Sequence, residues 1–251
     1  MQVARLGISL NQRGVVLPVR RSELKAEVVA LKRKRIVDTA RRLFYEKGYE
    51  RTTLDDIAER LQVTKPFIYS YYKNKNELLH EIAQQCISEC LQAQNHILKS
   101  KLSIPEKLAR IIEQVTQIII DNQANTIIYL REEMNLDWRV AQKIREQRND
   151  FDHKNMKLLR DGARSGSFNV VDERVTARCV GGILVWCALW YRDLGVLSPA
   201  AIAQLVSETV MRMVGSSARK ALSRQRSSKA PAPHKPNRAR KAKATGALAE
   251  L

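Results

Sequence analysis

The chain has 251 residues, 44% of them hydrophobic, and a formal net charge of +18 at pH 7. Its longest uncharged apolar stretch, from Cys179 to Tyr191, is shorter than the about 20 residues that span a bilayer, and no signal-peptide core is evident at the N-terminus. The composition therefore excludes a membrane-spanning protein, and we expect a cytoplasmic one with a small module and one larger domain.

The excess positive charge lies at the two ends of the sequence. Residues 1–35 hold nine Lys and Arg against two Glu, residues 215–251 hold ten against one, and residues 36–214 hold 25 basic against 23 acidic residues. We expect residues 1–31 to form a basic extension that is loose over residues 1–20, with a helix from about Glu23 that carries the basic run at residues 32–35 along DNA. As the alternative for residues 1–20, the start codon is placed too far upstream.

Residues 32–74 have the pattern of a small helical domain. Four apolar residues recur at helical spacing and mark the buried face of a first helix: Ile36, Ala40, Leu43 and Phe44. Gly48 can take the positive φ that ends this helix, and Thr52 or Thr53 can cap a second one. Short helices joined by a tight turn indicate a helix-turn-helix DNA-binding domain.

The third helix of this domain is the expected DNA reader. The tripeptide 61–63 makes the bend before it, and Thr64 can cap it. Pro66 stands in its first turn, where a missing amide hydrogen costs nothing, and we expect the helix to end near Tyr72. Its short or amphipathic side chains suit base edges and phosphates.

Residues 35–79 resemble the DNA-binding domain of the tetracycline-repressor (TetR) family of transcriptional regulators, and length and helix pattern extend the resemblance over most of residues 32–214. The expected DNA contacts are Thr53, Thr64, Lys65, Pro66, Tyr69, Ser70, Tyr71 and Lys75. Many members of the family have Gly at the position of Pro66, so the base contact there does not transfer. As the alternative, the tyrosines of this segment are ordinary core residues.

The rest of the folded chain has a helical pattern without strand alternation. The expected helices cover residues 75–98, 105–121, 124–135, 138–164, 172–193 and 199–214. We therefore predict an all-α protein, with a three-helix head at 32–74, a larger ligand-binding and dimerisation bundle at 75–214, and a disordered basic tail at 215–251. The tail would add salt-sensitive phosphate contacts, unless it serves solubility alone.

The penultimate helix contains the segment CVGGILVWCALWY, which is apolar on all sides and must be covered on all sides. We expect it to pair with its copy, together with the last helix, as a four-helix bundle, as the resemblance also implies. The expected interface residues are Gly181, Gly182, Val185, Ile202, Leu205, Val206 and Val210. Closure of the monomer core is the alternative. A homodimer suits a near-palindromic operator, since it spaces two reading helices one DNA turn apart.

The resemblance also implies a pocket for a small-molecule effector between the head and the expected dimer interface. The candidate ligand-binding residues are Tyr129, Arg131, Met134, Trp138, Met156, Arg160, Trp186 and Trp190. As the alternative, methionines and aromatic residues at helical spacing belong to an ordinary hydrophobic core. The segments LWYRDLGVLSP and LRDGARSGSF are similar to the C-terminal domain of regulators of fatty-acid, aromatic-acid and steroid catabolism, whose effectors are acyl-CoA thioesters.

The cysteines are too few and too scattered for a disulfide scaffold. Cys86 and Cys90, one helical turn apart, are either small core residues or a redox sensor. No histidine stands at metal-ligand spacing to them, and no nucleophile with a base, Gly-rich phosphate loop or metal set is present, so we expect no cofactor, no metal and no enzymatic activity.

These patterns predict a homodimeric, sequence-specific transcriptional regulator that binds double-stranded DNA, most simply a repressor that a small-molecule effector releases. The alternative is a DNA-organising, nucleoid-type protein that uses the same head and its basic ends without a ligand switch.

Overall fold

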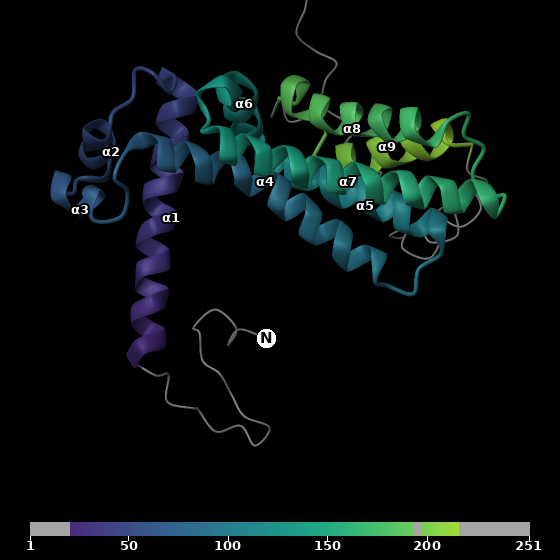
Figure 1. Cartoon of the computed structure of the whole chain (residues 1–251), viewed down its shortest axis with the longest axis horizontal. Helices are drawn as coiled ribbons and strands as arrows, with labels where there is room; N and C mark the ends of the chain where they lie inside the picture. Colours follow the sequence, from purple (N-terminus) through teal and green to yellow (C-terminus); the bar gives the residue numbers. More distant parts are fainter. Residues whose placement is uncertain (1–20, 193–196, 216–251) are drawn as a thin grey trace, which may run out of the picture. The chain divides into compact units, whose positions relative to one another are not determined.

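The computed structural model describes residues 21–192 and 197–215, and every element within them is a helix (Figure 1). The helices are α1 (Arg21–Lys47), α2 (Leu54–Leu61), α3 (Lys65–Tyr69), α4 (Lys75–Leu98), α5 (Ile104–Asp121), α6 (Gln123–Glu132), the 3-10 turn η2 (Glu133–Asn135), α7 (Trp138–Arg164), α8 (Glu173–Trp190) and α9 (Pro199–Met213). The predicted all-α class is confirmed. The predictions for residues 1–20 and for the tail from 216 onward lie outside the described residues. None of the described helices has the length and apolarity to cross a membrane.

Helix α1 supports the head with its second half. Residues 22–35 are exposed, whereas the helix turns a buried face to α2 and α4 from Ile36 onward. The helix ends before Gly48, whose φ of +88° is the left-handed conformation that the sequence predicts there. Of the two candidate threonines, Thr53 caps α2, whereas Thr52 is buried and donates its hydroxyl to the Gly48 carbonyl at 2.8 Å.

Helix α2 begins with a capping box. The Asp56 amide donates to Thr53 Oγ1 at 3.1 Å, and the Thr53 amide donates to Asp56 Oδ2 at 2.7 Å. The hydrogen bonds from Thr53 lower the pKa of the Asp56 carboxyl. Gln62 takes a φ of +56° after the helix, which makes the sharp bend predicted at residues 61–63. The bend orients α3 across α2.

Helix α3 is shorter than the sequence predicts, because it ends at Tyr69 instead of near Tyr72. The Ile68 carbonyl accepts from the amides of both Tyr71 and Tyr72, at 2.9 and 3.0 Å, which tightens the chain into a turn. Ser70 Oγ donates to the Phe67 carbonyl at 2.7 Å and occupies an acceptor that another helical turn would need. The prediction that Thr64 caps α3 is half right, since Thr64 stands at the N-cap position but its side chain makes no capping hydrogen bond.

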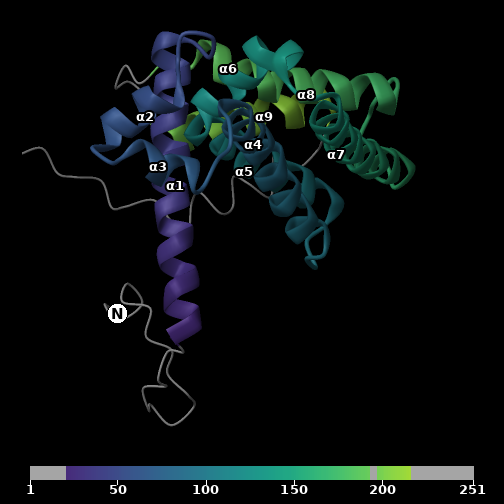
Figure 2. The same ribbon diagram turned by 60° about the vertical axis from the view of Figure 1, so that its left-hand side comes forward.

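Helix α5 lies at the centre of the body and packs against α4, α7, α8 and α9. Its buried face consists of residues at helical spacing: Leu108, Ile111, Ile112, Val115, Ile119 and Ile120. Helix α4 leads from the head into this bundle (Figures 1 and 2). A single cluster of buried residues extends from α1 through α4 to Ile128 of α6 and Ile144 of α7. Head and body therefore share one hydrophobic core.

Two body helices end earlier than predicted. The helix expected at 124–135 stops at Glu132 and continues only as the 3-10 turn η2, and the one expected at 172–193 stops at Trp190. At the latter end, Gln123 Nε2 donates to the carbonyls of Ala188 and Tyr191, at 2.7 and 2.9 Å. A side chain from α6 thus satisfies the last carbonyls of α8, and the helix can end there.

The turn after α7 depends on a glycine. A Cβ atom at Gly162 would lie 2.1 Å from the Phe168 ring, which folds back onto the helix end. The amide of the next residue, Asn169, donates to the Val214 carbonyl at 2.8 Å. Asn169, which directly follows the segment LRDGARSGSF, therefore links the turn after α7 to the end of α9.

Candidate DNA interface and effector cavity

The outer side of α3 is a continuous exposed surface. Five of the eight predicted DNA-binding residues are exposed there or at the cap before the helix: Thr64, Lys65, Pro66, Tyr69 and Ser70. Thr53 is exposed at the start of α2. Tyr69 keeps 52% of its surface accessible, although aromatic side chains are usually buried. We name this surface, from Thr64 to Ser70, the α3 face.

The three neighbouring tyrosines have different environments. Tyr69 is exposed, Tyr71 is half-buried with its ring centroid 5.2 Å from that of Phe67, and Tyr72 is 1% exposed. The core interpretation therefore holds for Tyr72 and in part for Tyr71. Tyr69 is the tyrosine free to meet a DNA groove.

The two lysines of the expected interface already have partners within the chain. Lys65 Nζ lies 2.6 Å from Asp55 Oδ2, and this carboxylate raises the pKa of the lysine. Lys75 Nζ donates to the carbonyls of Tyr49 and Glu50, at 3.0 and 3.1 Å, and lies 4.3 Å from the centroid of the Tyr49 ring. A phosphate contact by either lysine would compete with these partners.

The basic run before the head is only partly available to DNA. Arg33 pairs with Glu81 of α4, with Nη2 and Oε2 2.7 Å apart, and its guanidinium lies 4.8 Å from the centroid of the Tyr72 ring. Lys32 lies over the Phe67 ring, whereas Lys34 and Arg35 are exposed. Arg33 is exposed as well, but its guanidinium joins α1 to α4, so a phosphate contact by Arg33 would compete with Glu81.

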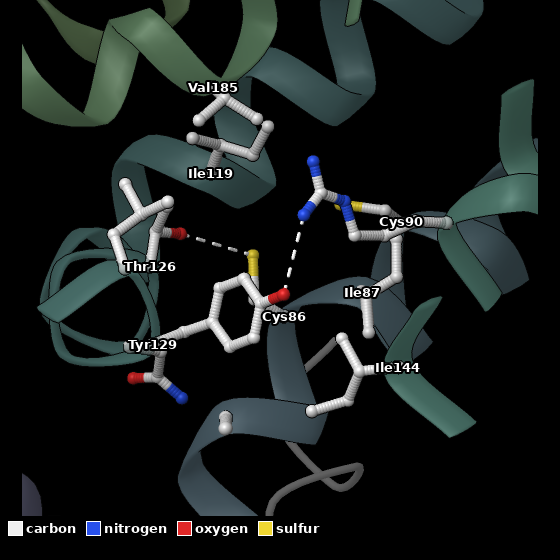
Figure 3. A pocket seen from close by; sticks show the side chains of 12 residues that line it. Cys86, Ile87, Cys90, Ile119, Thr126, Tyr129, Ile144 and Val185 are labelled. Atoms are coloured by element: carbon white, nitrogen blue, oxygen red, sulfur yellow. Dashed lines mark hydrogen bonds between the residues drawn. The ribbon is translucent and has the colours of Figure 1, made fainter. Parts of the chain in front are cut away.

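A mostly apolar cavity of about 90 Å³ lies in the body, and residues of α4, α5, α6, α7 and α8 line it (Figure 3). The lining includes Cys86, Ile87, Cys90, Ile119, Thr126, Tyr129, Ile144, Arg148 and Val185. Arg148 Nη1 donates to the Tyr129 hydroxyl at 3.3 Å, and this hydroxyl donates to Glu133 Oε1 at 2.9 Å. Burial is the largest cause of the raised pKa of Tyr129, so its hydroxyl stays protonated. We name this space the central cavity.

A second cavity of about 440 Å³ adjoins the first and shares Ile87, Cys90, Ile119, Arg148 and Val185 with it. Its other lining residues include Asp152 and Arg178, together with Gly181, Gly182 and Trp186 of α8. Burial raises the pKa of Asp152, whereas the nearby charges of Arg148 and Arg178 oppose this rise. The second cavity thus adds Asp152 and Arg178 to the Arg148 that lines both cavities.

Of the predicted ligand-binding residues, Tyr129 lines the central cavity and Trp186 the second one. The other six line neither. Met134 and Trp138 are 93% and 63% exposed, Arg160 pairs with Glu173, and Arg131 lies 5.9 Å from the centroid of the Tyr45 ring. Trp190 is exposed and Met156 half-buried. The cavity residues that the sequence did not single out, among them Thr126 and Arg148, lie on helix faces that periodicity assigns to ordinary packing.

Helix α6 connects the central cavity to the head. Asn125, Thr126 and Tyr129 all line the cavity, and Oδ1 of Asn125 also accepts from Arg41 of α1 at 3.3 Å. The side-chain Nδ2 of Asn125 donates to the Ile82 carbonyl of α4 at 3.1 Å. Helix α6 thus contacts the cavity, α1 and α4 at once.

The outward sides of α8 and α9 expose many large apolar residues. Val175, Trp186, Leu189, Trp190, Leu205 and Met213 are between 37% and 61% exposed. Gly182 is exposed in line with Trp186, and Gly181 and Val185 are half-buried. In contrast, Ile202 and Val210, which the sequence assigns to the dimer interface, are 6% and 0% exposed inside the chain, and Val206 packs beside Ile202. We name the exposed set the α8–α9 face.

Comparisons with known proteins agree with this arrangement. Residues 36–82 match the family model described as bacterial regulatory proteins, tetR family, and residues 101–214 match the one described as tetracyclin repressor-like, C-terminal domain. The fatty acid metabolism regulator protein of Bacillus subtilis is 25% identical over 179 residues, which cover 68% of this chain and 92% of that protein. The transcriptional repressor KstR2 of Mycolicibacterium smegmatis is 24% identical over 177 residues, 70% of this chain and 86% of the repressor.

Solved structures give the same result. The regulator PfmR of Thermus thermophilus has a TM-score of 0.66 and 27% identity, and the match covers 71% of this chain and 97% of that one. The matched families and relatives are DNA-binding regulators, and both parts of the architecture described above have counterparts among them.

Proposed function

Since the chain belongs to the TetR family of transcriptional regulators, we propose that it acts as a homodimeric repressor that leaves its operator when a small molecule enters the body. The observation that carries this proposal is the position of α6, which lines the central cavity on one side and holds α1 through Asn125 and Arg41 on the other. Repression, dimerisation and effector are all part of the proposal. Because its target is chromosomal DNA, we place the protein in the cytoplasm.

The α3 face is the proposed operator-reading surface. Tyr69 and Pro66 offer apolar contacts to thymine methyl groups, and Thr64 and Ser70 offer hydroxyls to base edges or phosphates. Thr53 and Lys75 are the proposed backbone contacts on either side of it. The exposure of Tyr69 supports this assignment, since an uncovered aromatic ring needs a partner to be removed from water.

The α8–α9 face is the proposed dimer interface. Its apolar residues are exposed in the single chain, and a second copy related by twofold symmetry would cover them. We assign Gly181, Gly182, Val185 and Leu205 to this contact and replace the buried Ile202 and Val210 with Trp186 and Met213. Close approach at Gly182 is favoured because an added Cβ there has no neighbour within 4 Å in the single chain.

The proposed effector occupies the two adjoining cavities. A short acyl group of a few carbons fits the central cavity, and the anionic part of the ligand would meet Arg148 and Arg178, which line the second one. An acyl-CoA thioester has this combination of groups. The relative in Bacillus subtilis that is named as a fatty acid metabolism regulator supports the same ligand class.

The test is fluorescence anisotropy on DNA flanking the protein's own gene, with excess non-specific competitor, before and after addition of a panel of acyl-CoA thioesters. Binding that resists competitor and is released by one thioester is the expected result. Arg178→Gln should bind DNA normally but need more thioester for release, whereas Arg139→Gln, an exposed arginine that lines neither cavity, should behave as the parent.

The charge of the two ends favours a second candidate, a DNA-organising protein without a ligand switch. Removal of residues 216–251 distinguishes the two. A repressor should keep its operator preference at moderate salt after this truncation, whereas an organising protein should lose most of its binding.

A further inference from the structure

Two cysteines with no part in the proposed function line the central cavity. Cys86 and Cys90 are free thiols one turn apart on α4, with 9% and 4% of their surfaces accessible. Figure 3 shows the Cys86 sulfur between Thr126 and the Tyr129 ring, in the middle of the lining side chains. This thiol therefore faces free volume.

Cys86 and Cys90 differ in their surroundings. The Thr126 hydroxyl donates to Cys86 Sγ at 3.5 Å. A hydrogen bond from the Cys90 thiol is the main cause that lowers the pKa of Cys86, and burial opposes it. The same hydrogen bond raises the pKa of Cys90, with burial acting in the same direction. The two thiols thus differ, because the pKa of Cys86 is lowered and that of Cys90 is raised, and Cys86 also accepts from Thr126.

The pair suits addition to an electrophile better than disulfide formation. Side chains four residues apart on a helix have Cβ atoms roughly 5–6 Å apart, beyond the about 3.5–4.5 Å of a disulfide, so a bond between the two sulfurs would distort α4. The central cavity, about 90 Å³, is smaller than a cavity of about 150 Å³ that holds benzene. It admits a reagent of only a few non-hydrogen atoms.

We propose that Cys86 is a covalent acceptor for small α,β-unsaturated aldehydes and ketones. The Cys86 thiolate forms a bond to the β-carbon, and the electron pair of the carbon–carbon double bond moves toward the carbonyl to give an enolate. Cys90 gives its thiol proton to the α-carbon and then regains a proton from water. Nothing is oxidised or reduced, so no further reactant is needed. Arg148, which lines the same cavity, is the cation that would stabilise the enolate oxygen.

Mass spectrometric peptide mapping of the full-length protein, treated with methyl vinyl ketone, tests this site. The exposed Cys179 is first replaced in the variant Cys179→Ser so that it consumes no reagent. Cys187 serves as the internal reference, since it is buried on α8, does not line the central cavity, and has its pKa raised by burial. We expect Cys86 to react at least about tenfold faster than Cys187 in the folded protein.

Thr126→Val, which removes the hydroxyl donor and keeps the side-chain shape, should slow the reaction at Cys86 and leave that of Cys187 unchanged. Equal rates at Cys86 and Cys187, or reaction of Cys86 only in denaturant, would overturn the proposal. If Thr126→Val does not fold, the rates of Cys86 and Cys187 in the Cys179→Ser variant still test the proposal. The measurement uses no DNA, so its outcome is independent of operator binding.

Discussion

The hydroxyl of Tyr72 donates a hydrogen bond of 2.9 Å to Glu81, and this bond ties the turn after α3 to the second turn of α4. Glu81 also accepts from Arg33, so one carboxylate joins three segments of the head. Both burial and the hydrogen bond to Glu81 raise the pKa of Tyr72, and burial is the larger cause. The phenol therefore remains a donor throughout the physiological pH range.

Tyr72→Phe should lower the free energy of unfolding by about 0.5–1.5 kcal/mol, the usual net value of one hydrogen bond. Urea unfolding followed by circular dichroism measures it. Tyr69→Phe is the matched control, since that side chain is exposed and its loss of a hydroxyl should leave stability unchanged. Equal effects of the two substitutions would show that the bond to Glu81 does not stabilise the head.

Tyr69→Ala should weaken operator binding by roughly 1–3 kcal/mol without loss of helix content, because the ring is exposed on the α3 face. Anisotropy titrations give the affinity and circular dichroism the fold. Tyr45→Ala, an exposed tyrosine of α1 outside the α3 face, is the control and should keep its affinity. A variant of Tyr69 that unfolds, or binds as the parent does, would contradict the assignment.

Gly182→Trp should convert the dimer to a monomer. A Cβ atom at Gly182 meets nothing within 4 Å in the single chain, so the fold should tolerate the substitution, whereas a partner at the α8–α9 face would be obstructed. Because Gly182 also lines the second cavity, the oligomeric state and not the effector response is the readout. Sedimentation velocity reports the mass, and operator affinity should fall with it, since each half-site then binds alone. Lys143→Trp on the exposed side of α7 should remain dimeric. A stable dimer of Gly182→Trp would place the interface elsewhere.

We expect the free energy of unfolding to fall in mild acid because of the environment of His80. Its Nε2 accepts from the Asp137 amide at 3.3 Å, which requires the neutral ring, and burial lowers its pKa although Asp137 and Glu77 oppose this. The unfolded state then binds more protons than the folded state below the ordinary value of 6.5, so stability falls as the pH drops from there toward the folded-state pKa.

His80→Gln keeps an acceptor without a titrating ring and should flatten the dependence of Tm on pH between about 7 and 5. Thermal melts across this range make the measurement. The exposed His153, changed to Gln, is the control and should leave the slope unaltered. An identical slope in His80→Gln and the parent would exclude His80 as the origin of the acid sensitivity.

Helix positions followed from the sequence because capping side chains mark the start of most of them. Asn74, Ser103, Asp172 and Ser198 each accept from a backbone amide of the first turn that follows, where the sequence shows a polar residue before an apolar run. The ends were harder to predict. At α8 the last carbonyls bind Gln123, which is distant in sequence, and no local pattern contains that contact.

The two candidate sites also differ in how far the sequence alone can predict them. The α3 face could be predicted because the bend, the short helix and the exposed polar side chains all lie within a few residues. The cavities could not, because their lining residues come from five helices, and a periodic apolar position such as Ile119 has the same sequence pattern beside a void as beside another side chain. Trp138 and Trp186 were both predicted to bind the ligand, and both are exposed in the single chain, but only Trp186 lines one of the two cavities.

Lys75 stabilises the head and is also a proposed contact to a DNA phosphate. Its ammonium group already closes the turn between α1 and α2 by bonding the carbonyls of Tyr49 and Glu50. If the Lys75 ammonium group binds a DNA phosphate instead, its hydrogen bonds to the Tyr49 and Glu50 carbonyls break when the protein binds its operator. Amide hydrogen exchange at residues 48–51 should then be faster in the operator-bound protein than in the free protein, while exchange in the rest of the head becomes slower. Faster exchange at these residues would indicate that Lys75 has exchanged the two carbonyls for a phosphate.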